Sequence, residues 1–114
     1  MYRLPMPERA ELVPGTLVML VLRVLQTGPL HGYAISQRIH QVSGDVLQVE
    51  EGSLYPALQK MLMKGWVEAE WGVSATKRRV RFYSLTPAGS HQLTAELSGY
   101  INMTEAIQAV LKFA

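Results

Sequence analysis

Residues 52–64 read GSLYPALQKMLMK, and this stretch decides the fold. Its apolar residues recur at the spacing by which one face of a helix packs on a core: Leu54, Leu58, Met61 and Leu62. A second set shares another face of the same helix: Ser53, Ala57, Lys60 and Lys64. The sequence therefore predicts a helix that is buried on one side and basic on the other, with Ser53 as its N-cap and Pro56 in its first turn.

Two segments of alternating polarity follow this helix. Val67, Ala69 and Trp71 alternate with glutamates, and residues 79–85 alternate again after a turn over residues 72–78. This pattern predicts a β-hairpin. Its turn is basic, since it carries Lys77, Arg78 and Arg79.

Two further helices are predicted upstream. Residues 16–26 are apolar nearly all round, which indicates burial on two sides and a subunit contact. Their inward stripe is predicted to be Leu17, Leu20, Val21, Val24 and Leu25. After a break at residues 28 and 29, a second helix is expected over residues 32–42, and residues 46–49 are expected to form a short strand.

A last helix is predicted to start at Thr86-Pro87, an N-cap followed by proline. Its apolar positions form a seam for the same helix of a second subunit: Leu93, Leu97, Tyr100, Thr104, Ile107 and Leu111. The elements together predict a mainly α fold with a small β-hairpin wing, that is, a winged helix-turn-helix with a C-terminal dimerisation helix. We expect an arm over residues 1–10, a DNA-binding domain over residues 11–86 and a dimerisation helix over residues 87–114.

Composition narrows the function. The 114 residues suit one domain, and a hydrophobic content of 48% suggests that a second copy covers part of the surface. The chain has no cysteine, its three histidines lack metal-like spacing, and it has neither a phosphate loop nor a serine elbow. We therefore expect no metal, no cofactor and no catalytic residues. The longest apolar run is too short to span a membrane, and prolines at positions 5 and 7 argue against a secretory signal, so we expect a cytoplasmic protein.

The charge is unevenly distributed. The whole chain carries only +2, but residues 60–86 hold six basic and two acidic residues, a local charge of +4. The rest of the chain is mildly acidic. One basic stretch on an acidic body is what binding to DNA phosphates requires.

Three motifs resemble the PadR-type transcriptional regulators: HGYAI at residues 31–35, GSLYPAL at 52–58 and YSLTPAG at 83–89. The resemblance covers residues 12–111 and implies a homodimeric repressor that binds a near-palindromic operator in double-stranded DNA and releases it when an effector arrives. Carried over from the family, the DNA-facing positions are Tyr33, Ser53, Tyr55, Lys60, Lys64, Lys77, Arg78 and Arg79. Many members are more basic on the third helix, where this chain has Gln59 and Met63.

The lysines are expected to hold phosphates, which leaves four residues to meet base edges: Ser53, Tyr55, Pro56 and Gln59. Leu17 and Leu20 are expected to join the seam in the dimer interface. Some relatives hold flat aromatic compounds between their subunits, against an aromatic residue of the last helix. Tyr100 occupies the matching place, so a small aromatic effector is expected to lie against Tyr100 and Met103.

Each assignment has a plainer alternative. For Lys60 and Lys64 the alternative is a solvated helix face without DNA contact. For the hairpin charges it is protection of the strand edge against pairing with another chain. The alternative for Tyr33 is a half-buried helix residue, for Tyr55 and Tyr83 it is the core, with Tyr83 the better candidate, and for Tyr100 it is plain packing. At the level of the whole chain, the alternative is a winged-helix protein-interaction module without specific DNA binding.

Overall fold

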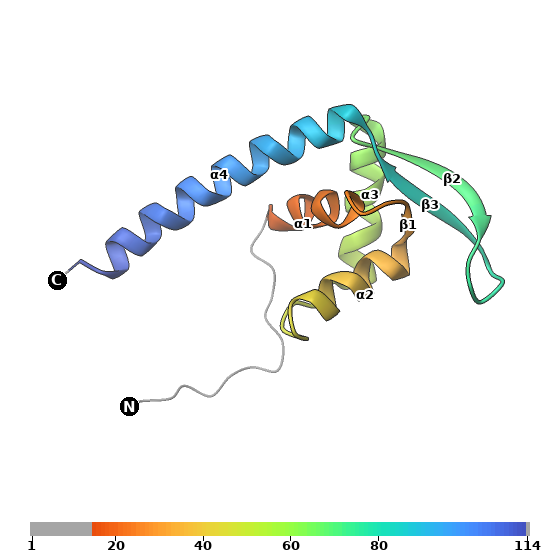
Figure 1. The fold of residues 1–114 in the computed structure, drawn as a ribbon, viewed down its shortest axis with the longest axis horizontal. Coiled ribbons are helices and arrows are strands. Elements are labelled where there is room, and N and C mark those ends of the chain that lie inside the picture. The colour runs from red at the N-terminus through yellow and green to blue at the C-terminus, as the bar shows by residue number, and fades with distance from the viewer. Residues whose placement is uncertain (1–14, 114) are drawn as a thin grey trace.

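The structure is a computed structural model and describes residues 15–113. The expected arm over residues 1–10 lies outside the described residues. In chain order the elements are α1 (Thr16–Leu25), β1 (Leu30–His31), α2 (Gly32–Val42), α3 (Glu51–Met63), β2 (Val67–Val73), β3 (Arg79–Leu85) and α4 (Pro87–Leu111). Figure 1 shows α1, α2 and α3 grouped in one body, from which the β2–β3 hairpin and the long α4 extend in opposite directions. The predicted mainly α fold with a small hairpin is confirmed.

The core lies where the three helices of the body meet the hairpin base and the first turns of α4. Its most deeply buried side chains come from several elements: Val21, Leu22, Ile35, Leu54, Leu58, Met61 and Leu93. Burying each such side chain contributes roughly 1.5–3 kcal/mol. The helical spacing at residues 52–64 predicted the three from α3 correctly.

The prediction for α1 was partly wrong. Met19 and Leu22 lie outside the predicted inward stripe, yet both are buried. Leu17 and Leu20, inside that stripe, are only partly buried. A helix that is apolar on nearly every side gives no sequence signal for which side faces the core, so its rotation depends on the elements that pack against it.

The sheet is antiparallel, with strand order β1-β3-β2. In the hairpin Val67 pairs with Leu85 and Trp71 pairs with Arg81. The third strand, β1, was not predicted, because two residues are too short to show any alternation. It pairs Leu30 with Tyr83 and so ties the start of α2 to the hairpin.

The strand predicted at residues 46–49 does not form, apart from a single bridge residue at Leu47. Side chains of α2 and of its C-cap, Ser43, bind the backbone of this segment instead. The Ser36 hydroxyl donates to the carbonyl of Val49 (3.2 Å), and the Ser43 hydroxyl accepts from the amide of Leu47 (2.9 Å). With these polar groups satisfied, Val49 is buried in the core without a strand partner.

Helix α3 begins earlier than predicted. Its N-cap is Glu50, and Ser53 lies inside the first turn, where its amide donates to the carbonyl of Glu50 (3.0 Å). Ser53 as N-cap is therefore wrong. Pro56 is the sixth residue of the helix rather than a first-turn residue, so it has no amide to donate to the carbonyl of Gly52. Gly52 is exposed, which lets water take that role.

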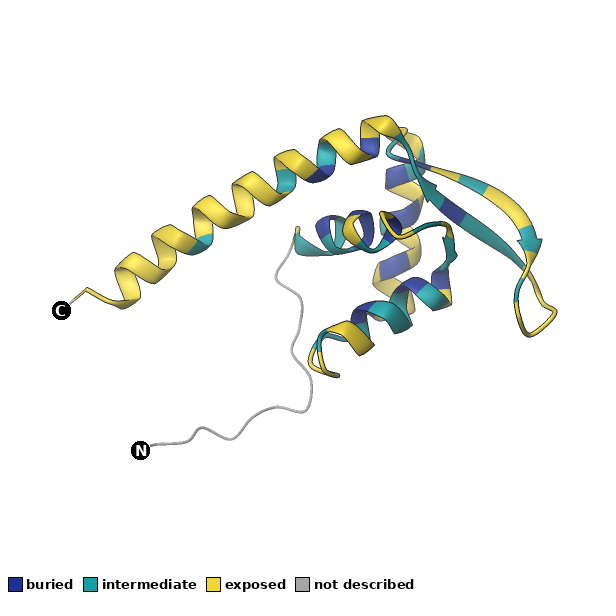
Figure 2. Ribbon diagram, viewed as in Figure 1, coloured by how far each residue is buried: buried dark blue, intermediate teal, exposed yellow. Residues whose placement is uncertain are grey.

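Helix α4 starts as predicted. The Thr86 hydroxyl accepts from the amide of Gly89 (3.0 Å) and donates to the carbonyl of Gly65 (2.6 Å), and Pro87 follows as the first helical residue. Figure 2 shows that the beginning of α4 is partly buried and the remainder almost wholly exposed. Leu93 belongs to the buried beginning and is 1% exposed. Its assignment to the dimer interface was therefore wrong, since its side chain packs in the core of its own protomer.

Candidate nucleic-acid interface

A large hollow lies between α2, α3 and the hairpin, with a volume of about 1050 Å³. We call it the hairpin groove. Its aromatic lining comes from all three elements: Tyr33, Tyr55, Trp71 and Tyr83. Its charged lining is three arginines and one glutamate: Arg38, Arg78, Arg81 and Glu51. A groove with aromatic walls and an excess of positive charge suits the backbone of a nucleic acid.

Tyr33 stands at the groove on the first turn of α2 and is 62% exposed. This turn is fixed by His31, whose Nδ1 accepts from the amide of Ala34 (3.3 Å) and whose ring meets Phe82 edge-on. Helix α2 thus begins with a side-chain cap that the sequence analysis did not identify. The cap holds Tyr33 toward the groove, where its exposed ring is free to contact a ligand.

Tyr55 lies on the neighbouring α3 and is 46% exposed. Its ring rests on Gly32, so closely that a Cβ at Gly32 would come 2.8 Å from the Tyr55 hydroxyl oxygen. Burial first, and the nearby Glu51 carboxylate second, raise the pKa of Tyr55 above its ordinary 10.0. The phenol therefore stays protonated and able to donate a hydrogen bond at the groove. Tyr83, by contrast, is buried, as its alternative interpretation predicted.

The predicted contacts on α3 divide between two flanks of the helix. Only Tyr55 and Gln59 line the groove, one turn apart. Ser53, Lys60 and Lys64 are exposed but belong to the other flank, and Pro56 lies exposed between the two flanks. The helix therefore offers a polar face toward the groove and a separate basic face beside it.

The hairpin turn is built by Ser74. Its amide donates to the carbonyl of Arg78 (2.8 Å), its carbonyl accepts from the amide of Lys77 (2.9 Å), and its hydroxyl accepts from the amide of Arg78 (3.2 Å). Lys77 takes a left-handed conformation there, with φ of 62°. The turn and the first residue of β3 present Lys77, Arg78 and Arg79 as exposed charges, and Arg78 also lines the groove.

Trp71 and Arg81 line the groove but were not among the predicted contacts. Trp71 is 60% exposed, and the guanidinium carbon of Arg79 lies 4.7 Å from its ring centre. Arg81 lies deeper, between the rings of Trp71 (5.8 Å) and Tyr83 (6.0 Å). Strand alternation was the available signal, because it places Arg79, Arg81 and Tyr83 on one face of the hairpin.

A second hollow, the α1–α4 cleft, has a volume of about 420 Å³. Both residues predicted to touch an effector, Tyr100 and Met103, line it. The other lining residues come from the start of α1 and the first half of α4: Gly15, Thr16, Met19, Gln92, Ala95, Glu96 and Gly99. The cleft is open, and it lies beside the exposed apolar part of α4.

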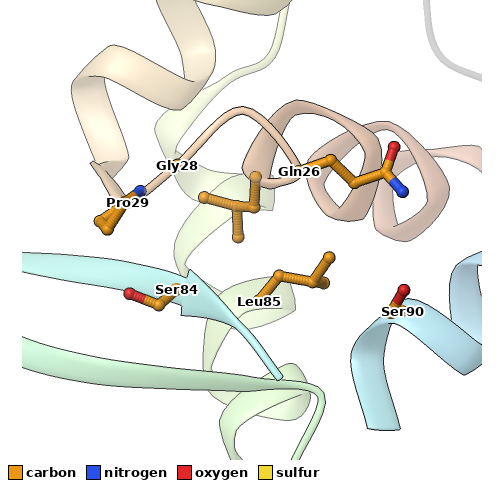
Figure 3. A pocket seen from close by; sticks show the side chains of 7 residues that line it. Gln26, Gly28, Pro29, Ser84, Leu85 and Ser90 are labelled. Carbon is orange, nitrogen blue, oxygen red and sulfur yellow. The ribbon is translucent and has the colours of Figure 1, made fainter. Parts of the chain in front are cut away.

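A third hollow of about 390 Å³ lies where the end of α1, β3 and the start of α4 meet (Figure 3). Figure 3 shows Leu85 in the space between α1 and α4, with Ser84 turned away from it. The described residues that line this hollow are uncharged: Leu25, Gln26, Gly28, Pro29, Ser84, Leu85 and Ser90. It therefore offers little to an anionic ligand.

A three-helix body with a basic hairpin and an exposed third helix defines a winged helix-turn-helix protein. The transcriptional regulator PadR-like family matches residues 21–95. The chain therefore belongs to this family of transcriptional regulators. Among residues 15–113, no helix combines the length and the apolar character needed to cross a lipid bilayer.

The chain is similar to several known proteins. An uncharacterized 37.1 kDa protein in a transposon of Streptomyces fradiae is 46% identical over 78 residues, which are 68% of this chain and 21% of that protein. The negative transcriptional regulator PadR of Bacillus subtilis is 27% identical over 73 residues, 64% of this chain and 40% of that protein. The chain thus spans less than half the length of either relative.

A solved structure of a transcriptional regulator from Clostridium thermocellum is similar in fold. It covers 86% of this chain and 95% of its own, with a TM-score of 0.79 and 24% sequence identity. The likeness therefore extends over most of both chains.

Proposed function

We propose that the protein is a dimeric, cytoplasmic repressor that binds a near-palindromic operator in double-stranded DNA. The observation that carries the proposal is the hairpin groove, where exposed tyrosines of α2 and α3 face a hairpin with a basic turn. In a winged helix-turn-helix, such a third helix enters the major groove and the hairpin reaches the flanking backbone. The similarity to a negative transcriptional regulator of Bacillus subtilis supports repression rather than activation.

In this proposal residues 11–86 read DNA and residues 87–114 join two protomers. The exposed large apolar side chains of α4 and its end support the second part: Leu97, Tyr100, Ile101, Met103, Ile107, Val110, Leu111 and Phe113. So many apolar groups on one helix indicate a surface that another protein covers. A second copy of the chain would cover this apolar surface on both protomers in the same way. Leu17 and Leu20 of α1 extend the surface.

Release of the operator is proposed to begin at the α1–α4 cleft. A small aromatic compound bound against Tyr100 and Met103 would lie where α4 leaves the body. Because the angle of α4 governs the separation of the two third helices, such a ligand would shift the spacing of the reading heads away from the roughly 34 Å of one duplex turn. Titration of flat aromatic compounds, followed by tryptophan fluorescence, tests this step.

The experiment for DNA binding is operator selection from a pool of random duplexes, preceded by a gel shift with random-sequence duplex at low salt. A DNA reader binds the random duplex weakly and enriches a motif with two related half-sites. A protein that binds neither the random duplex nor a selected sequence is instead an interaction module, and the proposal fails.

A further inference from the structure

Arg81 stands in the hairpin groove without a counter-charge. Its side chain is partly buried, and its Nε atom is fully covered but has no hydrogen-bond partner. In the part of the chain that the structure describes, the one ion pair joins His40 and Asp45, so no carboxylate there pairs with Arg81. Glu51 is the one acidic residue in the groove lining, and it makes no ion pair with Arg81.

A covered Nε–H without an oxygen partner is costly, because this donor has lost water and gained no hydrogen bond in exchange. The rings of Trp71 and Tyr83 lie on the guanidinium at 5.8 and 6.0 Å and hold it in place. These rings fix its direction but accept no hydrogen bond from its edge. The edge of a guanidinium fits the paired oxygens of a phosphate or a carboxylate. Arg81 is therefore oriented for an anion that the described residues do not supply.

The position of the groove indicates which anion arrives. If α3 enters the major groove of a duplex and the hairpin reaches the adjacent minor groove, one sugar-phosphate strand must pass between them, because that strand divides the two grooves. The space between α3 and the hairpin is the hairpin groove.

We infer that this sugar-phosphate strand of the DNA lies in the hairpin groove and that Arg81 binds one of its phosphates there. The inference rests on the proposed DNA binding and adds to it a contact between the reading helix and the wing. Arg78 at the outer end and Arg38 on α2 line the same path, so the strand would meet positive charge from both sides.

The test measures binding of a fluorescent random-sequence duplex by anisotropy over a series of salt concentrations. Arg81→Gln and Arg81→Met both remove the charge, Arg81→Lys keeps it, and Arg23→Gln removes an exposed charge of α1 that lies outside the groove lining. Loss of one phosphate contact should lower the slope of log affinity against log salt by about 0.9 for each bound protomer. We expect this change, and roughly a tenfold weaker affinity, for Arg81→Gln and Arg81→Met.

Arg81→Lys should keep the slope, and Arg23→Gln should behave as the wild type. A wild-type slope in both charge-removing variants overturns the inference and leaves the proposed function standing. A wild-type slope on random duplex together with an altered selected operator means that Arg81 meets a base edge, which also overturns it. Absence of any binding by the wild-type protein overturns the proposed function and this inference together. Having two charge-removing variants keeps the test decisive if one of them does not fold.

Discussion

Gly89 determines where α4 leaves the sheet. A Cβ at this position would collide with the carbonyl oxygen of Trp66 and come 2.8 Å from a methyl carbon of Leu85. The carbonyl is backbone and is tied to the amide of Thr86 (3.1 Å), so it has little freedom to move. Only glycine allows the first turn of α4 to approach the hairpin base this closely.

Replacing this glycine should therefore be costly. Gly89→Ala is expected to lower the free energy of unfolding by about 3 kcal/mol, because the new methyl group must displace backbone in a packed region. Urea denaturation at fixed protein concentration measures the change.

Gly99→Ala provides the matched control in the same helix, since a Cβ at Gly99 meets nothing within 4 Å. It should raise the free energy of unfolding by about 1 kcal/mol, through the higher helix propensity of alanine. Equal effects of the two substitutions would show that the close approach at Gly89 is not a constraint.

A similar close approach positions a candidate DNA contact. Gly32→Ala would place a methyl group against the outer end of the Tyr55 ring, a side chain that can move. The expected result is a modest loss of stability, roughly 1 kcal/mol, with a larger loss of operator affinity as Tyr55 is displaced from the groove. Gel shift on the selected operator, alongside urea denaturation, separates these two effects. An operator affinity unchanged from wild type would remove Tyr55 from the interface.

At the scale of elements, the helices and the hairpin were predictable because their signals are local. Spacing identified the buried face of α3, and Thr86 with Pro87 marked the start of α4. The groove was not predictable, because it exists only once α2, α3 and the hairpin are packed together. Arg81 was not predicted for the same reason. The contacts of its guanidinium with the rings of Trp71 and Tyr83 form only in the folded hairpin, and they are what distinguish it from an ordinary strand arginine.

The two basic elements make separable contributions to DNA binding. Removing Lys77, Arg78 and Arg79 together by alanine substitution should lower the salt slope by up to about 0.9 for each lost phosphate contact in each protomer. Removing Lys60 and Lys64 from the far flank of α3 tests the other basic face in the same way. Anisotropy on random duplex gives both slopes. If the hairpin variant keeps the wild-type slope, its charges serve another purpose, such as protecting the β2 edge.

The whole molecule is elongated, with extents of 54, 30 and 22 Å over the described residues. The 25 residues of α4 account for much of the length, and its C-terminal end projects beyond the body. A helix that projects this far with apolar side chains exposed has little reason to be stable alone, because isolated helices gain most of their stability from packing. The shape therefore favours pairing along α4.

This pairing should be separable from DNA contact. Ile107→Asp places a charge on the exposed seam and should convert the dimer to a monomer, as measured by light scattering after size-exclusion chromatography. The monomer should bind the selected operator roughly 10²-fold more weakly, because the second half-site no longer adds an intramolecular contact. Its affinity for a single half-site should match that of the wild type.

Asn102→Asp is the matched control, because it adds the same charge on the opposite side of α4, where the side chain is exposed. It should remain dimeric and keep its operator affinity. A dimer that survives Ile107→Asp would place the contact elsewhere, and a monomer that still binds the full operator as tightly as the wild type would show that each protomer reads DNA alone. Either result would remove the reason for α4 to extend beyond the body in the proposed repressor.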